Sequence, residues 1–436
     1  MKLSAHLGTI SWSLADKALY VGYGFVQLFM QVPALDPDIY GLFSLLVALN
    51  TWIMIVSDGS ALQGVIQFGS RPEERGRVHM MAMSVHLVIV GLSAGLVFLF
   101  QHPLSTVFGE PRFAAVASML PLYCALTIPR MFCLKLLYRD LRMRDLFVTD
   151  AVWFGVRTVL TLHALHTDTL RTLDDIIRID FIGMAASSVS AMIITRKQIV
   201  FGRSGSTSLM DYLRFGVPLA VATGLNSMPR QLDVFIIQAF FGAAAVGVYN
   251  PAKNLYRFFE QAFDAAVTLV YPAAVRLHTQ DRRHDLQILI TKAISITMVP
   301  VIVAVIVLEL GASQVIIPML GPKYAGAVTH FNVLCAAALA MPFLLMSSVL
   351  AALGKSTAIV AYSAIGLAAS VITLLIVGYF GLETWVGLGI VVNSFVVGAL
   401  CVYHVRREVP FPWSMTMRAF ADGRHFMNVI KKRIES

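Results

Sequence analysis

The chain has 436 residues, of which 57% are hydrophobic and only 14% are charged, and its mean hydropathy is +0.74. Soluble domains carry roughly 25% charged residues, so this composition excludes a disordered chain, a collagen-like fibre and an ordinary soluble enzyme. It indicates a protein that crosses a membrane several times. The net charge of +9 would suggest a nucleic-acid partner only in a soluble protein.

Twelve apolar stretches are long enough to span a bilayer, since a transmembrane helix needs about 20 residues. The second, seventh and eighth exceed one crossing and must tilt, kink or extend into water, and Pro229 is expected to kink the seventh. The first is expected to remain as an anchor, because no cleavage site follows it. In chain order the stretches are 8–33, 38–69, 77–101, 112–137, 145–167, 173–195, 211–241, 243–275, 285–310, 324–353, 356–379 and 384–404.

Positive charges are distributed unevenly between the two sides of the predicted bundle. We place 25 of the 34 Lys and Arg residues on one side, including Arg130 and Lys135, and three on the other. Basic connections stay in the cytoplasm, so both termini are expected there, and the charge surplus implies no nucleic-acid partner. The tail 406–436 is basic and amphipathic, which suits either an in-plane helix on the membrane or a solvated segment.

The two halves of the chain show weak internal sequence similarity. Gln31 and the segment 39–41, which opens the long second span, correspond to Gln238 and the segment 246–249, which opens the long eighth span. With six spans in each half, this predicts two parallel lobes, 1–200 and 201–405, around a central cavity, followed by the tail 406–436. The predicted fold class is therefore an all-α polytopic membrane protein with about 12 transmembrane helices.

Ionisable residues inside the spans form the candidate site, because each is unfavourable in hydrocarbon unless it faces a partner or a water-filled cavity. Span eight places Lys253, Arg257, Glu260 and Asp264 on one helical face. Arg and Lys suit a phosphate-bearing substrate, aromatic rings suit sugars, and carboxylates suit a coupling H+ or Na+. The predicted substrate-binding residues of these spans are Arg157, Arg230, Tyr249, Lys253, Tyr256 and Arg257. The predicted ion-coupling or charge-network residues are Asp16, Asp58, Asp150, Asp233, Glu260 and Asp264.

Two alternatives remain open for these charges. They could pair with one another as a purely structural network, and Arg178 and Asp180 in span six lie near enough to an end to extend toward water.

The sequence contains no P-loop, HExxH, GxSxG or dinucleotide-binding motif, and its histidines form no ligand cluster. We therefore expect no enzyme activity, metal or cofactor, and transport that is driven by ions or by substrate flux.

Three stretches resemble a known family. They are Val56–Gln67, with its Asp-Gly pair, the basic connection Leu137–Arg144, and a long third stretch. The third runs from Phe215–Pro218 through Asp233–Ile237 and Val246–Lys253 to Val270–Ala273. The chain resembles the oligosaccharide flippases of Wzx type, in the MOP superfamily that also holds MATE exporters and lipid II flippases.

The resemblance implies a bacterial inner-membrane protein that flips undecaprenyl-diphosphate-linked oligosaccharides by ion-coupled alternating access, for exopolysaccharide, capsule or O-antigen synthesis. It also implies a substrate-binding role for Lys17, because lipid II flippases have basic residues in span one. Membrane lipids, a polysaccharide polymerase and chain-length proteins are the implied partners. The alternatives are an ion-coupled exporter of cationic drugs or metabolites and a non-transporting scaffold in a synthesis complex.

Overall fold

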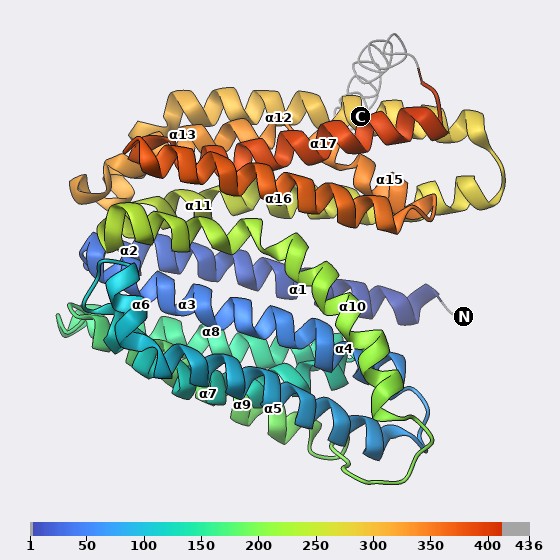
Figure 1. Cartoon of the computed structure of the whole chain (residues 1–436), viewed down its shortest axis with the longest axis horizontal. Coiled ribbons are helices and arrows are strands. Elements are labelled where there is room, and N and C mark those ends of the chain that lie inside the picture. Colours follow the sequence, from blue (N-terminus) through green and yellow to red (C-terminus); the bar gives the residue numbers. More distant parts are fainter. Residues whose placement is uncertain (1–2, 412–436) are drawn as a thin grey trace. The chain divides into compact units, whose positions relative to one another are not determined.

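The computed structural model describes residues 3–411, which are helical almost throughout and contain no strand within that range (Figure 1). Eight helices of this part are long and apolar enough to cross a membrane, and one bent pair could form a ninth crossing. Large apolar side chains remain exposed on these helices, such as Leu92, Leu310 and Tyr379. Such exposure would be unfavourable in water over so many residues, but it suits lipid. The all-α polytopic class is confirmed, whereas the count of twelve crossings stays a prediction.

Two compact units make up the described chain. The first holds residues 3–251 and 319–324, and the second holds 252–318 and 325–411. These units do not coincide with the predicted lobes 1–200 and 201–405, which stay a prediction.

The first unit contains the helices up to the start of α11, several of which pack closely. Helix α7 packs against α3, α5 and α9, and α8 packs against α1 and α9 (Figure 1). Two π-helical turns, η1 and η2, interrupt the first two spans. The elements are α1 (Leu3–Val26), η1 (Gln27–Gln31), α2 (Val32–Ala34), α3 (Pro37–Ser57), η2 (Asp58–Leu62), α4 (Gln63–Gln67), α5 (Arg75–Leu99), α6 (Gln101–Val107), α7 (Phe113–Arg139), α8 (Met143–His166), α9 (Leu173–Thr195), α10 (Leu209–Ser227) and α11 (Pro229–Thr279).

Helix α11 is two helices joined at a sharp turn. Gly242 has φ +83°, in the left-handed region that favours glycine. The Tyr249 hydroxyl donates to the Asp233 carboxylate at 2.8 Å, although sixteen residues of straight helix would separate them by about 24 Å. The two arms therefore fold back on each other. This agrees with the predicted turn between spans seven and eight, and the break between α10 and α11 falls at the predicted Pro229 kink.

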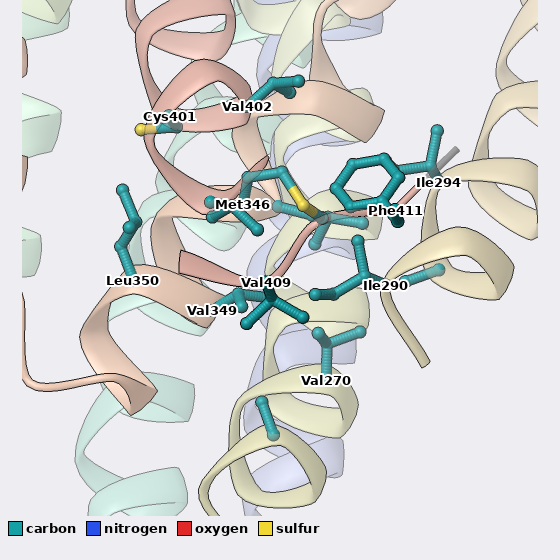
Figure 2. Close-up of a cluster of buried hydrophobic side chains, with 14 of the residues drawn as sticks. Val270, Ile290, Ile294, Met346, Val349, Leu350, Cys401, Val402, Val409 and Phe411 are labelled. Atoms are coloured by element: carbon teal, nitrogen blue, oxygen red, sulfur yellow. The ribbon is translucent and has the colours of Figure 1, made fainter. Parts of the chain in front are cut away.

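The second unit has its own apolar core (Figure 2). Side chains from α11, α12, α15 and α17 meet there, including Val270, Ile290, Met346 and Val402, together with Phe411. The remaining elements of the described chain are α12 (Arg283–Leu320), η3 (Pro322–Tyr324), α13 (Gly326–Ala338), α14 (Met341–Leu344), α15 (Met346–Ala352), α16 (Ser356–Tyr379), η4 (Glu383–Trp385) and α17 (Leu388–Glu408).

The helix ends match the predicted spans to different degrees. Spans six and eleven agree in full with α9 and α16. The Thr172 hydroxyl accepts from the amide of Asp175 and forms a capping box that starts α9 where predicted. By contrast, α12 continues to Leu320, ten residues past the predicted end of span nine, although it contains Pro318. It ends before Gly321, whose φ of +86° is typical of the residue that follows a helix. Helix α17 begins at Leu388, after a 3-10 turn that takes up the predicted start of span twelve.

Candidate functional site

The carboxylate of Asp58 lies in the π-helical turn η2 and is paired within the first unit. Lys135 of α7 approaches it at 2.8 Å, and the side-chain amide of Gln63 donates to it at 2.9 Å. A π turn widens the helix, and such turns often occur at functional sites. Lys135, which we counted among the charges of the basic side, lies inside α7 and is paired with Asp58. The side of the membrane on which it lies stays a prediction.

A second ion pair joins Arg130 of α7 to Asp150 of α8. Arg130 is 7% exposed, and its guanidinium lies 4.5 Å from the ring centroid of Trp153. It also donates to the Ser187 hydroxyl of α9 at 2.9 Å. The prediction that Arg130 lies in a basic connection is therefore wrong. Its positive charge is instead held inside the helical bundle of the first unit.

Asp16 of α1 adds a second carboxylate to this group. It lies within electrostatic reach of Asp150, Arg130 and Lys17. Its Oδ1 atom is buried and has no hydrogen-bond partner among the described residues. Asp16 and Asp150 are both partly buried. Two carboxylates therefore lie close to the buried Arg130 guanidinium, with the exposed Lys17 also within electrostatic reach.

A third ion pair joins Arg157 of α8 to Asp180 of α9. The guanidinium of Arg157 also lies 4.7 Å from the ring centroid of Tyr23 and 5.3 Å from that of Trp153. Asp180 is only 1% exposed, so the expectation that it extends toward water is wrong, although Arg178 is exposed. The pairing of Arg157 does not favour the substrate-binding role predicted for it.

Small and neutral polar residues complete this network. A Cβ atom on Gly183 would lie 2.4 Å from Cγ of Arg157, so glycine leaves the space that the arginine stem fills. At the end of η1, the side-chain amide of Gln31 donates to the Thr161 hydroxyl at 2.7 Å. Buried polar contacts therefore join four helices of the first unit, α1, α7, α8 and α9.

The two arms of α11 carry the remaining predicted residues of spans seven and eight. Asp233 is 1% exposed and Tyr249 is fully buried, and their hydrogen bond ties the arms together inside the first unit. Arg230, at the start of the first arm, is exposed. Tyr249 therefore has a bonded partner within the protein.

The second arm carries the row of ionisable residues that the sequence placed on one face. Lys253 is 4% exposed, Arg257 and Glu260 are half-buried, and Asp264 is exposed. Tyr256 is buried beside them, with 3% exposure. Exposure thus rises along about 17 Å of helix, from the buried lysine to the exposed aspartate. A phosphate-bearing molecule could meet two cations at the buried end of this row.

A polar clasp outside the spans holds the connection that follows α9. The Glu74 carboxylate accepts hydrogen bonds from the hydroxyl and amide of Ser206 at 2.6 and 2.7 Å and from the amide of Thr207 at 3.1 Å. These bonds from Ser206, and then from Thr207, lower the pKa of Glu74 to about 2. Arg77 donates to the carbonyl of Thr207 at 2.7 Å. The segment between α9 and α10 is therefore fixed to the start of α5.

Sequence reasoning missed three members of the buried network: Arg130, Asp180 and Tyr23. Arg130 could have been found, because it lies well inside the apolar stretch 112–137. Its neighbours Lys135 and Arg139 made it resemble the start of a basic connection. The partner of Arg157 could not be found from spacing, since Asp180 lies on another helix.

Long apolar helices enclosing paired charges define a multi-pass membrane protein rather than a soluble one. The fold is that of membrane transporters. A structure of the lipid II flippase MurJ in its inward closed conformation matches with a TM-score of 0.74 and 13% identity, covering 97% of this chain and 93% of that one. An inward-facing multidrug resistance MATE family transporter of the MOP superfamily matches with a TM-score of 0.66 and 15% identity, covering 97% and 96%.

The sequence comparison identifies the family. The family model described as Polysaccharide biosynthesis protein matches residues 9–278, more than half of the chain, and the chain belongs to that family. The succinoglycan biosynthesis transport protein ExoT of Rhizobium meliloti (strain 1021) is 21% identical over 312 residues. That alignment covers 67% of this chain and 58% of the relative, so the chain matches little more than half of the relative's length.

Proposed function

We propose that this protein translocates undecaprenyl-diphosphate-linked oligosaccharides across the bacterial inner membrane for exopolysaccharide, capsule or O-antigen synthesis. The observation that carries the proposal is the row of ionisable residues on the second arm of α11, in a chain of the polysaccharide biosynthesis family. Buried Lys253 and half-buried Arg257 supply the positive charge that a diphosphate needs. The transporter fold and the succinoglycan transport protein among the relatives support the same function.

The proposed site separates binding from coupling. Lys253 and Arg257 contact the diphosphate, while Tyr256 packs against a sugar ring. Arg230, which belongs to the first unit, is proposed separately as a substrate-binding residue. Glu260 and Asp264 tune these cations at the exposed end of the row.

Coupling is assigned to the carboxylates of the first unit. The buried Oδ1 of Asp16, within electrostatic reach of Asp150, is a position where H+ or Na+ would reduce the repulsion between two neighbouring carboxylates. Neutralisation of Asp16 would also change the strength of the adjacent ion pair between Asp150 and Arg130. This supports alternating access driven by an ion gradient.

The expected setting follows from the same proposal. Both termini lie in the cytoplasm, in line with the basic connections. A polymerase and chain-length proteins of the same polysaccharide route are the expected protein partners.

The test removes two of the proposed binding cations together. In a strain that lacks the chromosomal gene, Arg230→Ala with Arg257→Ala should abolish polymer export at unchanged protein level, because two of the proposed substrate-binding cations are lost. The matched control is Arg282→Ala with Arg283→Ala, two exposed arginines at the start of α12, which should export normally.

Two results would contradict the proposal. Normal export by the Arg230 and Arg257 double variant refutes the site. Unchanged polymer in the deletion strain, together with new sensitivity to cationic drugs, would favour the exporter alternative instead.

A further inference from the structure

The connection between α12 and α13 belongs to a different unit from most of the two helices that it joins. Residues 319–324 are part of the first unit, whereas α12 up to Pro318 and the chain from Ala325 onward are part of the second. These residues are therefore held by the first unit, while both of their ends are covalently continuous with the second. A movement of α12 and α13 relative to the first unit must pull this connection away from its contacts.

A buried tyrosine anchors the connection to the first unit. Tyr324 is fully buried, and its hydroxyl donates to the carbonyl of Leu35 at 3.0 Å. Leu35 has extended backbone angles and ends α2, so its carbonyl lies at a helix terminus, where carbonyls lack partners within the helix. A tyrosine hydroxyl that leaves water needs such an acceptor. The two groups therefore satisfy each other.

An ion pair accompanies the tyrosine at the surface. Nζ of Lys323 lies 3.3 Å from Oδ1 of Asp36, and the two side chains are 35% and 70% exposed. An ion pair with this exposure is weakened by water and by salt. Tyr324 therefore supplies most of the attachment, and the whole contact is small enough to be reversible.

The turn that receives the tyrosine is itself held by backbone packing. Helix α3 begins at Pro37, directly after this turn, and lies against the second arm of α11. A Cβ atom on Gly247 would lie 1.7 Å from the carbonyl oxygen of Pro37, and one on Gly41 would lie 1.8 Å from that of Ala243. The two backbones are in direct contact, with no side chain between them. The turn is thus a fixed seat, and the connection 319–324 is the part that can leave.

We propose that the connection 319–324 is a releasable clasp, which ties the ends of α12 and α13 to the turn before α3 and leaves that turn during each translocation cycle. The inference rests on the proposed function, because only a transporter has to open here. Basic residues are few in the connections at this end, which places it outside the cytoplasm in the predicted orientation. Release of the clasp opens the side on which the substrate leaves.

A reversible cross-link tests the clasp in cells. Asp36→Cys with Lys323→Cys would be joined by a short bis-methanethiosulfonate reagent, which the four buried native cysteines do not meet. We expect export of polymer to stop on cross-linking and to resume after reduction. The comparison pair is Asp38→Cys with Arg112→Cys, which replaces an ion pair of 2.6 Å between α3 and the start of α7, both in the first unit. This pair should export normally when cross-linked. Full export by the completely cross-linked clasp pair would overturn the proposal.

Hydrogen exchange in the purified protein follows the clasp without relying on transport. Tyr324→Phe keeps the ring but removes the bond to Leu35, so exchange in residues 319–324 should become faster by about threefold to tenfold. The control Tyr212→Phe removes another buried hydroxyl, which donates to the Ala61 carbonyl, and should leave that exchange unchanged. Unchanged exchange in Tyr324→Phe, or equal acceleration by the control, would also overturn the proposal. A wild-type protein that supports no export would refute the proposed function instead, while exchange still decides whether the connection releases.

Discussion

The buried pair of Arg157 and Asp180 is predicted to stabilise the first unit without contacting substrate. Asp180 is 1% exposed and Arg157 is 6% exposed, so either charge would be left uncompensated if its partner were removed. Removing one partner of a buried pair typically costs about 3–5 kcal/mol. We therefore expect Asp180→Asn to lower the free energy of unfolding by about 3 kcal/mol, because Arg157 stays positive at any accessible pH.

The partner variant and the double variant complete the cycle. Arg157→Met keeps an aliphatic stem in the space left by Gly183 and should cost less than Asp180→Asn, because a buried carboxylate can neutralise itself by taking a proton. The double variant removes both charges and should recover about 2 kcal/mol relative to the sum of the single changes.

The assay is denaturant unfolding in mixed micelles, with polymer export measured in parallel. The double variant should export polymer normally if the pair is structural. Additive single effects would refute the pairing. A stable double variant that cannot export would return Arg157 to the substrate-binding residues.

Two further predictions concern contacts outside the buried network. Hydrogen bonds lower the pKa of Glu74 to about 2. The clasp to Ser206 should therefore contribute fully to stability at pH values above the ordinary pKa of a glutamate. That contribution should be lost as the pH falls through about 2, where the carboxylate takes up a proton. Glu74→Gln should speed hydrogen exchange in residues 200–207 at neutral pH, and unchanged exchange would contradict this. Gly247→Ala should lower stability by about 1–3 kcal/mol, because its Cβ would lie 1.7 Å from the Pro37 carbonyl oxygen. The control Gly155→Ala, with open space around it, should be neutral or stabilising in the same denaturant unfolding assay.

Most of the helical architecture was accessible from the sequence because long apolar runs have one stable form in lipid. Helices α9 and α16 begin and end as predicted, and the turn at Gly242 and the break at Pro229 were also foreseen. The end of α12 was not foreseen, because no residue near position 310 forbids a helix and the apolar run ends gradually.

The candidate site was predictable in part for a different reason. Spacing along one helix identifies a shared face, as for Lys253, Arg257 and Glu260, but it does not identify partners on other helices. Arg130 and Lys135 were therefore read as orientation charges, whereas tertiary packing pairs them with Asp150 and Asp58. Which charges are neutralised internally is a property of the packed bundle.

Reconstitution into vesicles tests the central claim most directly. Purified protein would be placed in liposomes that contain an undecaprenyl-diphosphate-linked oligosaccharide, and a membrane-impermeant glycosidase would report the sugar in the outer leaflet. The account predicts that the wild-type protein makes the inner pool accessible and that Arg257→Gln slows this by about tenfold, the loss of one charge-assisted contact. Sugar accessibility equal to that of protein-free vesicles, at verified protein incorporation and with an imposed ion gradient, would contradict it.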